Sequence, residues 1–147
     1  MPRADLPARG FTLVETMVVL LIVAVLTLFA WPAFHTHWLR SRRADAQLAL
    51  MQLQQHQARW RTDHPGYATA AELGVPAASP LGHYRLTVHT PGAAGYLLQA
   101  EAVGGQRADT GCAVLLLRLE QAHTSTLSRT AAGVENPEPA NRRCWSR

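Results

Sequence analysis

The sequence predicts an α+β fold in which one long amino-terminal helix packs against a small antiparallel sheet. Two observations support this prediction. A helical pattern extends from the apolar segment that begins at residue 11 to about Arg61, and alternating stretches typical of strands appear only after residue 83. Helix first and strands afterwards is the order of an α+β chain, and 147 residues suffice for one domain.

The first part of the helical pattern is apolar. From Thr16 to Leu39 the sequence contains no Asp, Glu, Lys or Arg, and about 20 such residues span a bilayer as a helix. Glu15 precedes this run directly, although a carboxylate at mid-membrane depth costs about 2.5 to 3.5 kcal/mol. We therefore predict a transmembrane helix over residues 11–38, in which Glu15 needs a partner.

Two other interpretations of the apolar segment are a secretory signal peptide and a plain membrane anchor. The segment is too long for a signal peptide, and no A-x-A-like cleavage site follows it. A plain anchor, with the Glu15 side chain extended to the membrane surface, stays open on periodicity alone. Side chains typical of a membrane interface stand where the segment would leave the bilayer: Trp31, Phe34, His35, His37 and Trp38.

The second part of the pattern, residues 39–61, is amphipathic. Apolar positions recur at steps of three and four residues, as on one face of a helix, and polar residues occupy the other face. The apolar stripe consists of Ala46, Ala49, Leu50, Leu53, His56 and Trp60, and the polar side of Arg42, Asp45, Gln52, Gln55 and Arg59. We expect the sheet to pack on the apolar stripe.

The rest of the chain is predicted to form a loop, a sheet and a tail. His64, Pro65 and Gly66 should end the helix, and residues 62–82 form a loop with one possible helical turn at Thr69 to Leu73. Strands are predicted within residues 83–130, at Tyr84 to His89, Tyr96 to Ala102, Ala113 to Leu119 and, more weakly, Ser125 to Thr130. An irregular tail with two prolines should follow.

The two cysteines, Cys112 and Cys144, belong to a chain with an export segment. Export points to an oxidising compartment and to one disulfide, whereas two unrelated buried thiols are the alternative. A bridge that closes the loop 112–144 would stabilise the fold by roughly 3 to 4 kcal/mol in the chain-entropy model.

A short run at the start of the apolar segment points to a known family. Gly10 and Phe11 are followed by Thr-Leu-Val and Glu15, and this run resembles the leader-peptidase site of type IV pilins and pseudopilins. The resemblance implies that residues 1–10 are a leader cleaved after Gly10, that Phe11 becomes the methylated amino terminus, and that Glu15 acts in assembly. It also implies the pilin fold, with a periplasmic head at residues 39–147.

Further features extend the resemblance. Pro32 matches the helix-kinking proline of the family, and it should bend or locally melt the helix near Leu28 to Trp31. The cysteine pair matches the family's disulfide-closed carboxyl-terminal loop, and the segments GGQRADTGC and RRCW resemble the PilE and ComP group of minor pilins. Thr16 and Trp31 depart from the usual residues, but neither is required for processing.

Motifs of catalysis and metal binding are missing from the sequence. The seven histidines form no H-E-x-x-H, the cysteines have no C-x-x-C spacing, and no G-x-G-x-x-G phosphate loop occurs. Asp109, Glu101 and Glu120 lack the spacing of a calcium loop. We predict no enzymatic activity, no cofactor and no metal site.

The basic charge comes from 14 arginines, without any lysine, against 10 acidic residues. Genomic bias can explain this usage, but guanidinium groups also suit contacts with phosphate. In ComP-like pilins the disulfide loop touches DNA, so the resemblance makes the arginines in or beside that loop candidates for DNA binding: Arg107, Arg129, Arg142 and Arg143, with Arg147 at the end of the sequence.

Three hypotheses of function follow. The first is a minor pilin that is held in the inner membrane, processed by the prepilin peptidase and methylase, and packed with other pilins by the assembly platform into an extracellular pilus, or fimbrium. It would support pilus biogenesis, twitching motility, adhesion or DNA uptake. The second is a DNA-uptake receptor like ComP. The third is a type II secretion pseudopilin, against which the cysteine pair argues.

Overall fold

The computed structural model describes residues 12–92 and 94–146, and at residues 29–30, 32–33 and 91–92 it describes the backbone alone. The chain divides into two compact units, Met1–His35 and Thr36–Arg147, and the second unit is the head. The described part of the first unit is helical, whereas the head combines helix and sheet. This is the predicted α+β architecture.

Helix α1 comprises Leu13–Asp63. At its start the hydroxyl oxygen of Thr12 accepts a hydrogen bond from the amide of Glu15 (3.2 Å), which satisfies one of the free amides of a helix terminus. At its end the ring of His64 stacks on Trp60 with 3.9 Å between the centroids, and Arg61 donates to the carbonyl of His64 (2.8 Å). The predicted helix end is therefore confirmed.

The first unit contains the apolar half of α1. All its described large apolar side chains from Leu13 to Leu28 are exposed. Helix α1 continues through Pro32, so the helix is not locally melted near Leu28 to Trp31, and a bend there stays a prediction. Among the described residues, no helical stretch combines the length and the apolar character needed to cross a membrane.

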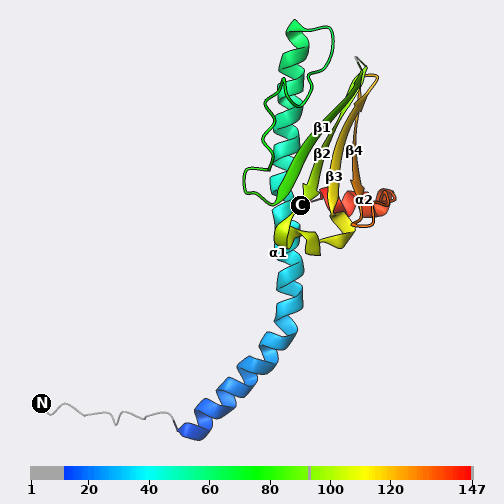
Figure 1. The fold of residues 1–147 in the computed structure, drawn as a ribbon. Coiled ribbons are helices and arrows are strands. Elements are labelled where there is room, and N and C mark those ends of the chain that lie inside the picture. Colours follow the sequence, from blue (N-terminus) through cyan, green and yellow to red (C-terminus); the bar gives the residue numbers. More distant parts are fainter. Residues whose placement is uncertain (1–11, 93, 147) are drawn as a thin grey trace, which may run out of the picture. The chain divides into compact units, whose positions relative to one another are not determined.

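Four strands form one antiparallel sheet in the order β1-β2-β3-β4. They are β1 Tyr84–Gly92, β2 Gly95–Ala102, β3 Val114–Glu120 and β4 His123–Arg129. Each strand pairs with its neighbour in sequence, and the predicted strands are confirmed with shifted ends (Figure 1). β1 extends to Gly92 through an irregular pairing after His89, and β4 begins at His123.

The core of the head lies between α1 and the sheet, which runs alongside the helix in Figure 1. Helix α1 contributes Ala46, Ala49, Leu50 and Leu53, and the sheet contributes Tyr84, Leu86, Tyr96, Leu98, Ala100, Leu115 and Leu117. All these side chains are buried. The first four residues of the predicted apolar stripe are therefore confirmed as core residues.

The last two residues of that stripe were predicted wrongly. His56 is exposed and Trp60 is half-buried, and Gln57 is the buried residue of that turn. The Gln57 side chain donates to the carbonyl of Ala68 (2.7 Å) and accepts from its amide (2.9 Å). Because both polar ends are paired, the glutamine is stable inside the head.

Asp45, predicted on the polar side, is also buried. Its carboxylate accepts hydrogen bonds from the hydroxyl of Ser79 (2.5 Å) and from the amides of Leu81 (3.0 Å) and His83 (3.4 Å). Donors of this kind offset the cost of removing a carboxylate from water. Asp45 and Gln57 thus attach both parts of the 62–82 loop to α1.

The possible helical turn at Thr69 to Leu73 is a single hydrogen-bonded turn and not a helix. The amide of Leu73 donates to the carbonyl of Thr69 (3.1 Å), and Gly74 ends the turn with a φ of +59°. The carboxylate of Glu72 accepts bonds from the amide (2.7 Å) and the hydroxyl (2.8 Å) of Thr69. These two bonds lower the pKa of Glu72, and the bond from the amide has the larger effect.

Short helices complete the head. The 3₁₀ helices η1, Gly104–Ala108, and η2, Thr110–Cys112, connect β2 to β3, and helix α2, Glu138–Trp145, follows β4. The predicted irregular tail is therefore wrong for residues 138–145. Prolines suggested irregular structure, but Pro137 caps α2 and Pro139 lies in its first turn, where no amide hydrogen is needed.

The hairpin between β3 and β4 turns through Gln121 and Ala122, whose φ angles of 48° and 68° lie in the left-handed region. Two-residue hairpin loops of this kind favour Asn-Gly. We expect Ala122→Gly to raise the free energy of unfolding by about 0.5 to 1 kcal/mol, because relief of the left-handed strain exceeds the entropy that glycine adds to the unfolded chain.

Urea unfolding of the full chain in a neutral detergent measures this effect. Ala131→Gly is the matched control, because Ala131 is an exposed turn residue whose φ is not positive. We expect the control to lose stability. An equal loss in both variants would show that the hairpin turn is not strained.

Candidate functional site

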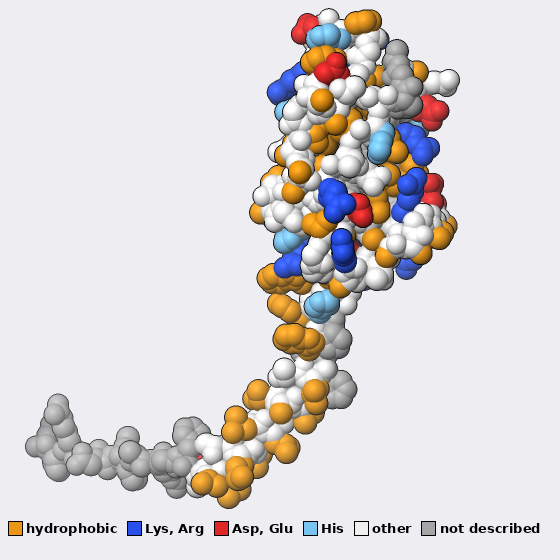
Figure 2. Space-filling view, viewed as in Figure 1, with side chains coloured by type: hydrophobic (Ala, Val, Ile, Leu, Met, Phe, Trp, Pro, Cys, Tyr) orange, Lys and Arg blue, Asp and Glu red, His pale blue; other side chains and the backbone are white. Residues whose placement is uncertain are grey.

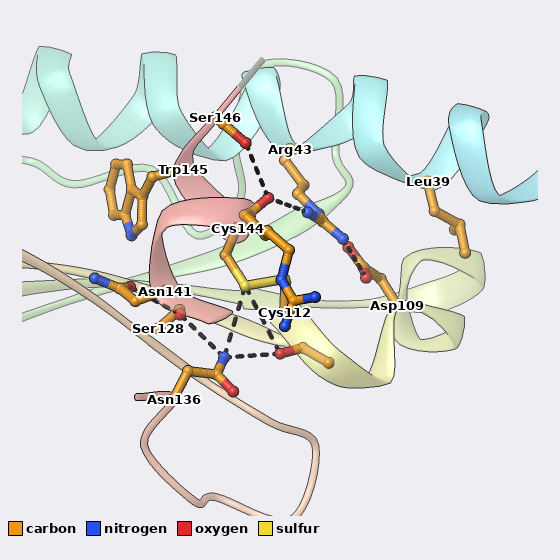
Figure 3. The surroundings of a disulfide bond; sticks show 12 residues. Leu39, Arg43, Asp109, Cys112, Ser128, Asn136, Asn141, Cys144, Trp145 and Ser146 are labelled. Carbon is orange, nitrogen blue, oxygen red and sulfur yellow. Dashed lines mark hydrogen bonds and ion pairs between the residues drawn. A yellow bond between two sulfur atoms is a disulfide. The ribbon is translucent and has the colours of Figure 1, made fainter. Parts of the chain in front are cut away.

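The candidate site is the end of the head where a disulfide joins α2 to the segment before β3. Cys112, at the end of η2, and Cys144, in α2, form this bond with 5.6 Å between their Cα atoms. Both residues are buried, and Figure 3 draws the bond between them. The predicted disulfide is confirmed, and the alternative of two unrelated thiols is excluded.

Asparagine side chains attach α2 and the segment before it to β4. The amide nitrogen of Asn141 donates to the carbonyl of Thr126 (2.8 Å), and its oxygen accepts from the hydroxyl of Ser128 (2.9 Å). Asn136 donates to the same hydroxyl (3.0 Å) and to the carbonyl of Gly111 (2.8 Å). Figure 3 shows these side chains on one side of the disulfide.

Further contacts fix the last turn of α2. The indole nitrogen of Trp145 donates to the carbonyl of Leu127 in β4 (3.0 Å). From the other side, Gln47 of α1 donates to the carbonyl of Trp145 (3.2 Å). Helix α2 has only eight residues, too few for a stable isolated helix, so these contacts and the disulfide hold it in place.

A buried ion pair lies next to the disulfide. The guanidinium of Arg43 in α1 donates to both carboxylate oxygens of Asp109, through Nε (2.6 Å) and Nη2 (2.8 Å). Its Nη1 donates to the carbonyl of Arg143 in α2 (2.9 Å). Both charged side chains are about nine-tenths buried. Arg43 therefore connects α1 to the η1–η2 segment and to α2 at once.

Gln106 extends this polar network into the core. Its side-chain nitrogen donates to the carbonyl of Leu39 (3.0 Å) and to the hydroxyl oxygen of Tyr84 (3.0 Å). Burial raises the pKa of Tyr84 to about 12, and the nearby carboxylate of Asp109 adds to the rise. The tyrosine is therefore a neutral hydrogen-bonding group at ordinary pH.

The candidate DNA-binding arginines lie on several elements. Arg142 and Arg143 are exposed neighbours on α2, and Arg107 is exposed in the last turn of η1. Arg129 is half-buried at the end of β4, and Arg147 lies outside the described residues. Figure 2 shows basic side chains spread over one face of the head with a few acidic ones among them. Only Arg142 and Arg143 are brought together by a common helix.

The acidic residues considered for calcium do not meet. Asp109 pairs with Arg43, and a carboxylate oxygen of Glu101 in β2 lies 3.7 Å from the guanidinium of Arg85 in the neighbouring strand β1. Glu120 stands opposite Gly95, at the other end of β2 from Glu101. Within the described ranges, no three His, Cys, Asp or Glu side chains are placed to hold a metal ion.

Of the residues predicted for processing and assembly, Gly10 and Phe11 lie outside the described residues. Glu15 is exposed in the first turn of α1, and Pro32 is described only by its helical backbone. Their roles therefore stay predictions.

Comparison with known protein families identifies the chain. A family described as "Type IV minor pilin ComP, DNA uptake sequence receptor" matches residues 32–116, which is more than half of the chain. The chain belongs to this family of type IV minor pilins. A second family, "Prokaryotic N-terminal methylation motif", matches residues 7–31 of the minor pilin. A comparison of the whole chain with curated proteins found no match.

These matches confirm the predicted fold and the minor-pilin function, and they favour a minor pilin over a secretion pseudopilin. The members of pilin families are structural subunits and not enzymes. The methylation motif indicates a pilin that is processed at the membrane and assembled into a pilus.

The extent of the ComP match bears on the DNA-binding candidates. The matched residues end at 116, so they include Arg107 but not Arg129, Arg142 or Arg143. A role for the arginines of α2 therefore has to be argued from their own geometry.

Sequence reasoning missed Arg43, Asn136 and Asn141, and it considered Asp109 only as a calcium ligand. Arg43 and Asp109 are separated by 66 residues, and no local pattern pairs residues so far apart. The one available signal was the position of Arg43 on the same side of α1 as Ala46 and Leu50, which places a charge beside the core stripe.

Proposed function

We propose that this minor pilin binds duplex DNA through the arginines of α2 while it is part of a type IV pilus. The observation that supports the proposal is the fixed position of α2. The disulfide, the Arg43 hydrogen bond and the Asn141 contacts all hold the helix, and it carries two adjacent exposed guanidinium groups. Groups that are already ordered lose little entropy on binding.

The charges of α2 are available for phosphate. The Nε atom of Arg142 lies 3.7 Å from a carboxylate oxygen of Glu138, but both side chains are more than 70% exposed. This ion pair therefore contributes little to stability, and a phosphate can replace the carboxylate readily. The backbone carbonyl of Arg143 accepts the hydrogen bond from Arg43, whereas the residue itself is exposed, so its guanidinium group is available to a ligand. Arg107, in the adjoining η1 segment, and Arg129, at the end of β4, would add further phosphate contacts.

The steps before DNA binding are those of a pilin. We infer that the prepilin peptidase removes residues 1–10 and that the methylase modifies Phe11. Residues 11–38 then hold the subunit in the inner membrane, until the assembly platform packs it against other pilins in the extracellular pilus. Two features support this course, the methylation motif at residues 7–31 and the exposed apolar side chains of the first unit.

Salt-dependent binding of the full chain to duplex DNA tests the proposal. The double variant Arg142→Gln, Arg143→Gln should bind more weakly, and the slope of log affinity against log salt should flatten by roughly 2, because about two fewer phosphates are neutralised. Fluorescence anisotropy of a labelled duplex in a series of salt concentrations gives both values.

The matched control is Arg59→Gln, Arg85→Gln, which removes the same charge from exposed positions outside the disulfide end. We expect the control to keep the original slope. Equal flattening in both double variants would mean that only net charge matters, and absence of binding at low salt would refute the receptor function.

A further inference from the structure

A groove in the head lies between α1 and the disulfide end. It encloses about 760 Å³, within the range of sites that hold an organic ligand. One wall is formed by α1, with His37, Arg40 and Ala44, and the facing wall includes the disulfide, Ala140 and Arg143. The groove is therefore much larger than a single phosphate ion needs.

The charges around this groove are all positive. No acidic residue lines it, and the third lining arginine, Arg43, is already neutralised by Asp109. Arg40 and Arg143 are exposed, and within the described part of the chain neither takes part in an ion pair. Two uncompensated guanidinium groups on facing walls favour an anion, and guanidinium suits phosphate in particular.

Part of the remaining lining is apolar, although the polar residues Ser41, Gln47, Asn136 and Ser146 also line the groove. Ala44, Ala140 and the disulfide contribute a surface that a phosphate alone, or a DNA backbone, would leave without a partner. A ligand that carries a phosphate next to hydrocarbon uses both kinds of surface. A phospholipid, with its phosphate joined to a glycerol and acyl chains, has this chemistry.

The position of the groove in the sequence agrees with a lipid. His37 lies at the end of the predicted membrane segment 11–38 and Arg40 directly after it, and Trp38 between them is half exposed. Arg42 of the same turn lies over the Trp38 ring, 5.1 Å from its centroid. Aromatic residues followed by arginines are typical of the headgroup layer of a membrane.

We propose that this groove binds the headgroup phosphate of an anionic phospholipid while the minor pilin is in the membrane, before assembly. The inference rests on the membrane-held stage of the proposed function and not on DNA binding. Lipid in the groove would be released when the subunit leaves the membrane for the pilus.

Native mass spectrometry of the full chain in a neutral detergent tests the inference, with short-chain phosphatidylglycerol as the probe. We expect phosphatidylglycerol to remain bound, and phosphatidylcholine with the same acyl chains to bind more weakly. Arg40→Gln and Arg143→Gln should each lower the phosphatidylglycerol affinity roughly fivefold, the usual effect of one arginine at an anionic membrane surface. The control Arg59→Gln, Arg85→Gln should keep it.

Three outcomes would overturn the inference. Equal weakening in the control variant would mean general electrostatic attraction, displacement by inorganic phosphate at equal ionic strength would mean a site for free phosphate, and an equal loss of DNA affinity in Arg40→Gln would assign the groove to nucleic acid. DNA titration of Arg40→Gln separates the two proposals. Unchanged DNA affinity with weakened lipid binding supports the lipid site, and full lipid binding by a chain that binds no DNA refutes the receptor function alone.

Discussion

Asp109→Leu is expected to lower the free energy of unfolding by about 3 to 5 kcal/mol. The substitution removes the carboxylate that accepts two hydrogen bonds from Arg43 and leaves the guanidinium buried with only the carbonyl of Arg143 as an acceptor. A buried charge without its counterion costs several kcal/mol. Since Arg43 also contacts α2, the loss should loosen the disulfide end first.

The double variant Arg43→Met, Asp109→Leu should recover most of that stability, because no unpaired charge remains inside. Glu101→Leu provides the control, since the pair of Arg85 and Glu101 is about half exposed and should contribute less than about 1 kcal/mol. Urea unfolding of the full chain in a neutral detergent, followed by near-ultraviolet circular dichroism, measures all three. Similar losses in Asp109→Leu and Glu101→Leu would show that solvent reaches the Arg43 pair.

Local sequence patterns predicted much of this fold. The steps of three and four residues placed Ala46, Ala49, Leu50 and Leu53 on the buried face of α1. Alternation located the strands because successive side chains of a strand point to opposite faces. These features depend on neighbours within a few residues, so a single sequence contains them.

Buried polar residues were beyond such patterns. Gln57 and Asp45 count as polar in any periodicity, yet both are buried because loop groups elsewhere in the sequence satisfy them. A polar residue can be placed inside only when its partner is known, and the partner is a product of the fold. The same holds for Arg43, whose acceptor lies 66 residues away.

Helix α2 escaped prediction for a related reason. Its sequence, EPANRRCW, contains a proline and little apolar surface, so no helical stripe appears. Its stability comes from the disulfide and from the contacts of Asn141 and Trp145 with β4. The cysteine pair predicted that residues 112 and 144 meet, but not that a helix would present Arg142 and Arg143 there.

The largest effect on function is expected for Glu15. In the isolated chain this carboxylate is exposed in the first turn of α1, next to a surface of exposed apolar side chains. Packing that surface against other subunits would take the carboxylate out of water, at a cost of several kcal/mol unless it is paired. Cleavage after Gly10 would create a positive amine at Phe11, and the amine of an adjacent subunit is the partner that we expect.

Glu15→Val should therefore insert into the membrane and be cut normally, yet its share in sheared pili should fall at least tenfold, since the loss of a buried ion pair exceeds the roughly 1.4 kcal/mol that a factor of ten requires. The share of Glu15→Asp in sheared pili should be intermediate, because the aspartate side chain is one methylene shorter and its carboxylate does not fully reach the partner amine. The measurement is the fraction of the protein in sheared pili relative to the membrane pool.

Two controls separate assembly from processing. Gly10→Val should remain an uncut precursor in the membrane, whereas mass spectrometry of Glu15→Val should find an amino terminus at Phe11. If Glu15→Val reaches pili at the level of the unmodified protein, the carboxylate has no role in assembly. Glu15 would then be explained by the plain-anchor interpretation, in which its side chain extends to the membrane surface and no subunit contact depends on it.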